Sequence, residues 1–332
     1  MRARLLKRKT LPGRPTGVVP VWGGGWWMAY GGGPGEAVVL DADLEERHRF
    51  PLPLRHDSGD ADDFAVGRGG CLLAVSRDDG IEVAGSGPLS GIQWRRQHGY
   101  WSDYPSGRGA CAFSPDGSVL WVVVRPEEAD GEGPDGPFDG DECHAYDATT
   151  GELLARASLG VDLSYARLHP HPGGRQVGLV VGQEHDWVSG YWVGATGRRL
   201  VMEPLGQSSH DDHQSLEAVA PDGNHCLTRS LSTLRSHAHP SNMLLAERLM
   251  SDIFPEGHPG LYTFVHRDAS SVLATFDDGV TPPRSWLLDM PSLELADSVV
   301  YPEPLPMHTV ASAGDGMWIT VHDDVVSQWS TA

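Results

Sequence analysis

Histidine and aspartate are the side chains of this chain that offer the most chemistry, and they gather in a few short segments. They supply nitrogen and oxygen ligands for transition metals, and a histidine oriented by a carboxylate can act as a general base. Such segments contain ten of the 16 histidines: His56, His98, His185, His210, His213, His237, His239, His258, His308 and His322. These residues form one site only if the fold brings their segments together.

A divalent transition metal is the first ligand that these residues suggest, and it would make the protein a metal-dependent hydrolase or lyase. His210 and His213 enclose two aspartates, so this segment alone offers both kinds of donor. His237 and His239 are two apart and would point the same way in an extended segment. No spacing matches an established metal-binding motif, so composition alone supports the metal. The candidate ligands are His185, His210, Asp211, His213, His237, His239 and His322.

Metal-free catalysis is a second possibility. His98 or His185 would then be the general base, and Asp186 the carboxylate that orients it. The sequence contains no GxSxG or HExxH motif and no glycine-rich loop of the kind that binds phosphate. The residues therefore indicate no particular reaction.

Non-enzymatic binding is the third possibility and the function that we expect. Aspartate favours turns because its side chain hydrogen-bonds nearby backbone amides, so Asp-rich segments are typical of solvated loops. Exposed aromatic side chains beside such loops would anchor a protein, a peptide or a small ligand. The candidate binding residues are Tyr100, Trp101, Asp103, Tyr104 and Trp187.

A repeat along the chain predicts the elements that carry these segments. "CAFSPDGSVLWVVV" (111–124) indicates two apolar strands around a Ser-Pro-Asp-Gly turn. Related hairpins have their last turn residue at positions 24, 70, 117, 174, 223, 270 and 316, which are 46, 47, 57, 49, 47 and 46 residues apart. Two further strand-like segments follow most of these hairpins. This period is typical of β-propeller blades, each a four-stranded antiparallel sheet.

We therefore expect an all-β, seven-bladed propeller that forms a single domain over residues 1–332. The last repeat lacks a fourth strand, and the basic segment 3–12 precedes the first repeat without another partner. We expect this N-terminal strand to complete the last blade and close the ring. The expected blades cover roughly residues 17–54, 60–97, 107–159, 161–205, 214–253, 259–301 and 306–332, the last together with 3–12.

The Ser-Pro-Asp-Gly turn at 114–117, its copies and "YDATTG" at 146–151 resemble the WD-repeat and related propeller families. The Trp-Asp dipeptide of WD repeats is absent, and the Gly-His dipeptide that opens a typical repeat occurs convincingly only at Gly257-His258. In such propellers the hairpins between the first and second strands lie on a lower face. The loops after the second strand and before the first strand meet on the upper face, and the His- and Asp-rich segments fall there. The resemblance also implies a structural role for His258, His308 and His213.

Charge and composition disfavour several classes of partner. The net charge of −20 opposes binding to nucleic acid or to an anionic membrane surface, and no apolar run reaches the 18 residues of a membrane span. The four cysteines are scattered without a CxxC pair, which is typical of a reduced, cytoplasmic protein. We expect a cytoplasmic monomer that binds its protein, peptide or small-molecule partner on the upper face.

Overall fold

The computed structural model describes most of the chain. The described residues are 1–13, 15, 17–21, 26–30, 36–51, 63–77, 79–99, 109–126, 140–160, 163, 165–183, 187–205, 214–254, 261–277, 283–303 and 310–331. Contacts divide the chain into two compact units. Unit 1 contains Met1–Arg55 and Leu216–Ala332, and unit 2 contains His56–Ser215.

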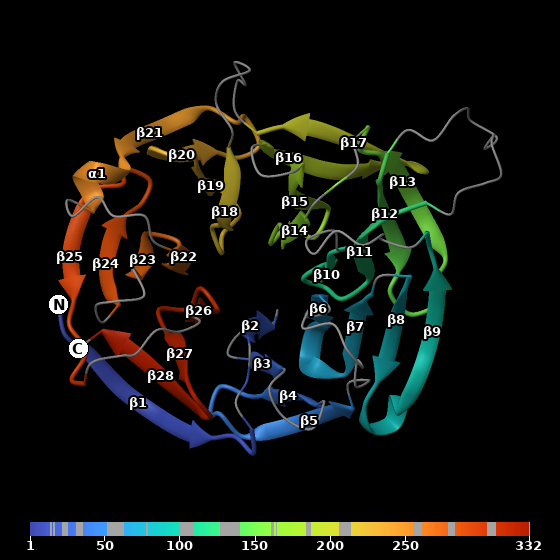
Figure 1. Ribbon diagram of the computed structural model, residues 1–332, viewed down its shortest axis with the longest axis horizontal. Helices are drawn as coiled ribbons and strands as arrows, with labels where there is room; N and C mark the ends of the chain where they lie inside the picture. Colours follow the sequence, from blue (N-terminus) through green and yellow to red (C-terminus); the bar gives the residue numbers. More distant parts are fainter. Residues whose placement is uncertain are drawn as a thin grey trace. The chain divides into compact units, whose positions relative to one another are not determined.

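Unit 1 consists of four-stranded sheets in which consecutive strands are hydrogen-bonded neighbours (Figure 1). One sheet contains β2 (Gly17–Val21), β3 (Trp26–Tyr30), β4 (Glu36–Leu40) and β5 (Glu46–Pro51). The next contains β18 (Ser215–Val219), β19 (His225–Arg229), β20 (Thr233–Ala238) and β21 (Leu244–Leu249), followed by the short helix α1 (Met250–Ile253). A third contains β22 (Leu261–Asp268), β23 (Ser271–Asp277), β24 (Arg284–Asp289) and β25 (Leu295–Val299).

The remaining sheet of unit 1 combines strands from both ends of the chain. It contains β26 (Val310–Ser312), β27 (Trp318–His322), β28 (Val325–Thr331) and β1 (Ala3–Thr10). β1 pairs antiparallel with β28, from Ala3 opposite Thr331 to Thr10 opposite Val325. The N-terminal strand therefore supplies the fourth strand that the last repeat lacks.

Unit 2 contains one four-stranded and one eight-stranded sheet. The smaller sheet is β6 (Asp63–Val66), β7 (Leu72–Ser76), β8 (Gly80–Gly85) and β9 (Gly91–Gln97), with the 3-10 turns Arg68–Gly70 and Gly87–Leu89 between its strands. The larger sheet begins with β10 (Cys111–Phe113), β11 (Val119–Val124), β12 (Glu142–Asp147) and β13 (Leu153–Ser158). It continues with β14 (Tyr165–Pro170), β15 (Gln176–Gln183), β16 (Trp187–Thr196) and β17 (Arg199–Pro204).

The eight-stranded sheet differs from the separate blades that the sequence predicts. It consists of two four-stranded antiparallel halves, whose outer strands β13 and β17 are joined by one parallel pairing, Arg156 opposite Arg199. This single pairing at the outer edge is the contact that joins the two antiparallel halves into one sheet. The antiparallel order within each half is the one expected from the repeat.

Burial differs between the strands of one sheet, and this difference explains which strands are mainly apolar and which carry charged residues. All seven residues of β23 are buried, whereas Trp94 is the only buried residue of the outer strand β9. Strands buried on both faces are continuous apolar runs, and solvated outer strands carry the charges. Apolar clusters join neighbouring sheets: Leu227 and Phe264 do so in unit 1, and Trp121 and Leu179 in unit 2.

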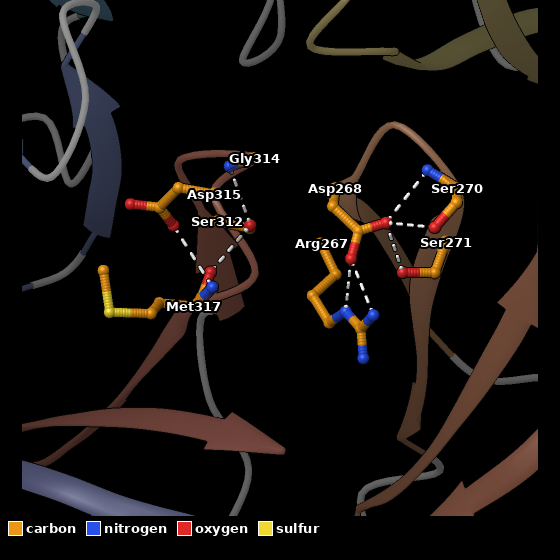
Figure 2. A network of polar contacts seen from close by, with 8 residues as sticks. All are labelled: Arg267, Asp268, Ser270, Ser271, Ser312, Gly314, Asp315 and Met317. Atoms are coloured by element: carbon orange, nitrogen blue, oxygen red, sulfur yellow. Dashed lines mark hydrogen bonds and ion pairs between the residues drawn. The ribbon is translucent and has the colours of Figure 1, made fainter.

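Most turns between the first and second strands of the sheets share one backbone conformation, a residue with positive φ at the last turn position. Gly117 closes the Ser114–Gly117 turn with φ at 75°, a conformation that a Cβ disfavours, and its N–H donates to the Ser114 carbonyl at 2.8 Å. Positive φ recurs at the other predicted turn positions 70, 174, 223 and 316. At position 270 the chain has serine instead. There Asp268 accepts bonds from Ser270 N, Ser270 Oγ and Ser271 Oγ (Figure 2).

All four cysteines are free thiols. Cys111, Cys143 and Cys226 are buried, and burial raises the pKa of Cys143 and of Cys226 to about 12. In the described part of the chain, no helix has the length and apolar character needed to span a membrane.

Candidate functional site

Most of the site predicted from the sequence lies outside the described residues. This applies to the binding candidates Tyr100, Trp101, Asp103 and Tyr104, and to His185, Asp186, His210, Asp211 and His213. It also applies to the side chain of Trp187, whose backbone opens β16. The roles of these residues stay predictions, as does the structural role of His258 and His308.

The four predicted histidines that are described occupy separate local environments. His98 follows β9 in unit 2, is buried, and places Nδ1 2.8 Å from the Gly99 carbonyl oxygen. His237 is buried in β20, with Nε2 3.1 Å from Thr228 Oγ1, and burial lowers the pKa of His237. His322, at the end of β27, is 45% exposed and lies 3.4 Å from the Asp323 carboxylate.

The pairing of His237 with His239 requires a correction. We expected both to point the same way if the segment is extended, but β20 ends at Ala238 and His239 lies in the following turn. The His239 amide donates to the Asn224 carbonyl instead of continuing the strand. Among the described residues no three His, Cys, Asp or Glu side chains are grouped so that they could hold a metal ion. The metal hypothesis therefore depends on the residues outside them.

A different set of ionisable side chains comes together on the innermost strands of unit 2. Asp63 is the first residue of β6, and its Oδ2 accepts the amide of Cys111, the first residue of β10, at 2.7 Å. This hydrogen bond links neighbouring sheets. Burial raises the pKa of Asp63 to about 6, although the amides of Cys111 and Phe64 and the charge of Arg167 act in the opposite direction.

Arg167 and His169 lie two residues apart on β14 and therefore share one face of this strand. Ala166 and Leu168 point to the other face, where they pack on the apolar cluster between β10–β13 and β14–β17. Burial, together with the charge of Arg167, lowers the pKa of His169 to about 3. His169 Nε2 is buried and has no hydrogen-bond partner among the described residues.

We call Asp63, Arg167 and His169 the inner cluster, because Asp63 is hydrogen-bonded to the first residue of β10, β10 contacts β14, and Arg167 and His169 share one face of β14. The Arg167 side chain is exposed, and no carboxylate of the described residues lies within ion-pair distance of its guanidinium group. Arginine in this state offers a planar fork of donors to a ligand. His169 stays neutral at physiological pH, and Asp63 changes its protonation close to neutrality. The cluster can thus form charged and neutral hydrogen bonds to a polar molecule.

The sequence contains a signal for this cluster that the histidine count does not reveal. Asp63 ends the Asp-rich segment 55–63 that precedes the first strand of its repeat. In "YARLHP" (165–170) arginine and histidine alternate with alanine and leucine. On an innermost strand this alternation places both polar side chains on the face opposite the apolar contact.

Comparison with known proteins supports the fold. A scan of protein-family models and a search of curated proteins find no match. A solved structure described as "Dihydro-heme d1 dehydrogenase NirN in complex with DHE", a cytochrome d1-like β-propeller, is similar with a TM-score of 0.54 and 17% identity. The chain has a β-propeller fold. The likeness covers 94% of this chain but only 62% of that one, less than two thirds of its length. At this identity it shows the fold alone, and the resemblance to WD-repeat propellers rests on the sequence motifs.

Proposed function

We propose that the chain is a seven-bladed β-propeller that acts as a non-enzymatic binding platform, and that its ligand is a small molecule held by the inner cluster. Five four-stranded sheets and the two halves of the eight-stranded sheet support the number of blades. The pairing of β1 with β28 supports a ring closed by both ends of the chain. The net charge of −20 supports a monomer without a nucleic-acid or membrane partner.

The inner cluster is the observation that carries this proposal. Several other arginines pair with carboxylates, as Arg47 does with Asp41 and Arg229 with Glu217. Within the described part of the chain Arg167 and Asp63 form no such pair, although the chain has 45 acidic and 25 basic residues. A partly buried carboxylate, and an imidazole nitrogen that has no partner among the described residues, reduce the free energy of unfolding. Ionisable groups that lower the stability of the fold in this way are typical of binding and catalytic sites.

The position of Asp63 supports the use of the face predicted from the sequence. Asp63 and Cys111 are the first residues of their strands. They therefore lie at the end of the sheets where the loops before the first strands arrive, the end that we assigned to the upper face. A small molecule fits this position because it can reach side chains on innermost strands, whereas a folded protein partner contacts mainly the loops.

A binding screen combined with metal analysis tests the proposal. We expect protein purified without a His tag to contain no stoichiometric transition metal and to keep its Tm in the presence of a chelator. In a thermal-shift screen of small molecules and peptides, we expect a small molecule that binds saturably and is recovered unchanged. A metal that is lost in His210→Ala would contradict a metal-free platform and favour the metal-dependent alternative, and turnover of the bound compound would show an enzyme. Saturable binding of peptides alone would exclude the small-ligand platform.

A further inference from the structure

The strand that carries Arg167 presents a row of polar side chains on one face. Tyr165, Arg167 and His169 alternate with Ala166 and Leu168, so the three polar residues share the face opposite the apolar cluster. The ring of Tyr165 lies over Gly182 of β15, where an added Cβ would come within 2.0 Å of Tyr165 Cε1. The glycine opposite Tyr165 thus allows the ring to lie flat on the sheet beside Arg167.

The charge of this face favours an anion most strongly below pH 6, where Asp63 is protonated. With Asp63 protonated the inner cluster carries the single positive charge of Arg167, and with Asp63 ionised the two charges cancel. Asp63 Oδ2 accepts the Cys111 amide at 2.7 Å, and within the described part of the chain Asp63 forms no ion pair with the guanidinium group. A cation would meet Arg167 first and be repelled. A carboxylate or phosphate matches the donor fork of arginine and can accept two parallel hydrogen bonds from it.

We propose that the inner cluster binds the carboxylate or phosphate group of a small molecule, with the Arg167 guanidinium group as its anchor and His169 as a second hydrogen-bond donor. This inference rests on the proposed binding function and specifies the chemical class of the ligand. His169 is suited to the second role because its buried Nε2 has no partner among the described residues. Tyr165 and Gly182 would form the adjoining wall of the site.

Titration calorimetry with inorganic phosphate and with succinate, at constant ionic strength, tests the inference. We expect saturable binding of one of these anions to the wild type. We expect at least a tenfold loss of affinity in Arg167→Ala and in Arg167→Gln, with partial recovery in Arg167→Lys, which restores the charge without the fork. Succinamide, which lacks the charge, should not bind. Because Arg167 is exposed, these variants should keep the Tm of the wild type.

Arg175→Ala is the matched control, because Arg175 is an exposed arginine in the turn that follows β14 and should leave anion affinity unchanged. Equal affinity in the wild type and Arg167→Ala, or an equal loss in Arg175→Ala, would overturn the anion site. Binding of neither anion would also overturn it, and saturable binding of a neutral compound would then leave the binding platform intact. Conversely, turnover of an anion whose binding needs Arg167 would support the anion site and contradict the non-enzymatic function.

Discussion

At the scale of single residues, Asp63 links the proposed site to the stability of the protein. Its pKa is about 6 in the folded state, against 3.8 for an ordinary aspartate, because burial disfavours the charged form. The folded state therefore holds a proton that the unfolded state has released between these two pH values. The stability from this proton is fully present below pH 3.8 and is lost as the pH rises to 6. Above pH 6 the charged form reduces the free energy of unfolding by up to about 3 kcal/mol.

Asp63→Asn should for this reason stabilise the protein at pH 7.5. The amide oxygen still accepts the Cys111 N–H, while the buried charge disappears, so we expect the Tm to rise by a few degrees. The gain should vanish at pH 4, where Asp63 is protonated. Asp79→Asn, which changes an exposed aspartate of the same unit, should leave the Tm unchanged at both pH values. A lower Tm for Asp63→Asn at pH 7.5 would mean that the carboxylate stabilises the fold.

A buried histidine pair in unit 1 has the opposite dependence on pH. The rings of His225 and His266 meet edge to face with centroids 5.4 Å apart, and both are buried. Burial and the neighbouring His225 lower the pKa of His266 to about 4, against the opposing charges of Asp222 and Asp268. The unfolded state takes up a proton first as the pH falls through 6.5. Stability is thus complete above pH 6.5 and is lost toward pH 4, by up to about 3 kcal/mol.

His266→Gln should reduce the loss of stability between pH 6.5 and pH 4, because the variant has no imidazole to protonate at this position. We expect the Tm of the wild type to fall between pH 6.5 and pH 4 more steeply than the Tm of the variant, measured by circular dichroism in matched buffers. His322→Gln serves as the control, since His322 is 45% exposed and its substitution should leave the slope unchanged. Parallel curves for the wild type and His266→Gln would assign the acid sensitivity to other groups.

At the scale of elements, the turn that lacks glycine is held by its aspartate. Asp268 accepts three hydrogen bonds from Ser270 and Ser271, and its Oδ2 also accepts bonds from Arg267 Nε at 2.8 Å and Nη2 at 2.6 Å (Figure 2). The Arg267 carbonyl receives the Gly316 amide from the neighbouring hairpin at 2.8 Å. This turn therefore fixes the contact between two adjacent sheets of unit 1.

Asp268→Ala should destabilise the protein by about 2–3 kcal/mol, because it leaves several donors without their acceptor. Asp315→Ala is the matched control from the neighbouring turn in Figure 2, where Asp315 accepts one bond, from the Met317 amide at 3.1 Å. We expect the control to cost about 1 kcal/mol or less. Urea unfolding followed by tryptophan fluorescence measures both values. An equal decrease in the free energy of unfolding in the two variants would show that the additional hydrogen bonds of Asp268 do not stabilise the fold.

The same elements explain how far the sequence predicts this molecule. Strand positions and the turn spacing follow from local patterns, because Gly117 and its counterparts need positive φ and buried strands need apolar runs. The inner cluster does not follow from such patterns. Asp63 and Arg167 are about one hundred positions apart, and only the packing of neighbouring sheets brings them together. His237 and His239 are an example of a local pattern that misleads. Their spacing suggests that both side chains point the same way, but β20 ends between them at Ala238.

At the scale of the whole molecule, the N-terminal strand ties together three sheets of unit 1. β1 pairs with β28 along its length, and Lys7 and Lys9 form ion pairs with Asp43 and Glu45, which lie between β4 and β5. On the other side, Ala3 N donates to the Val300 carbonyl, directly after β25, at 2.9 Å. The side chains of Ala3 and Leu11 are buried. β1 thus contributes hydrogen bonds, apolar contacts and ion pairs to three sheets at once.

Deletion of residues 1–12 should therefore lower the Tm by more than ten degrees and cause self-association, because β28 would become an unpaired edge with apolar neighbours. Differential scanning calorimetry and light scattering measure the two effects. A synthetic peptide of residues 1–12, added in trans, should restore the Tm in a concentration-dependent way. The double variant Lys7→Ala/Lys9→Ala is the control and should cost about 1 kcal/mol or less, since exposed ion pairs contribute little. A deletion that keeps the Tm of the wild type would contradict the proposed closure of the propeller by the two chain ends.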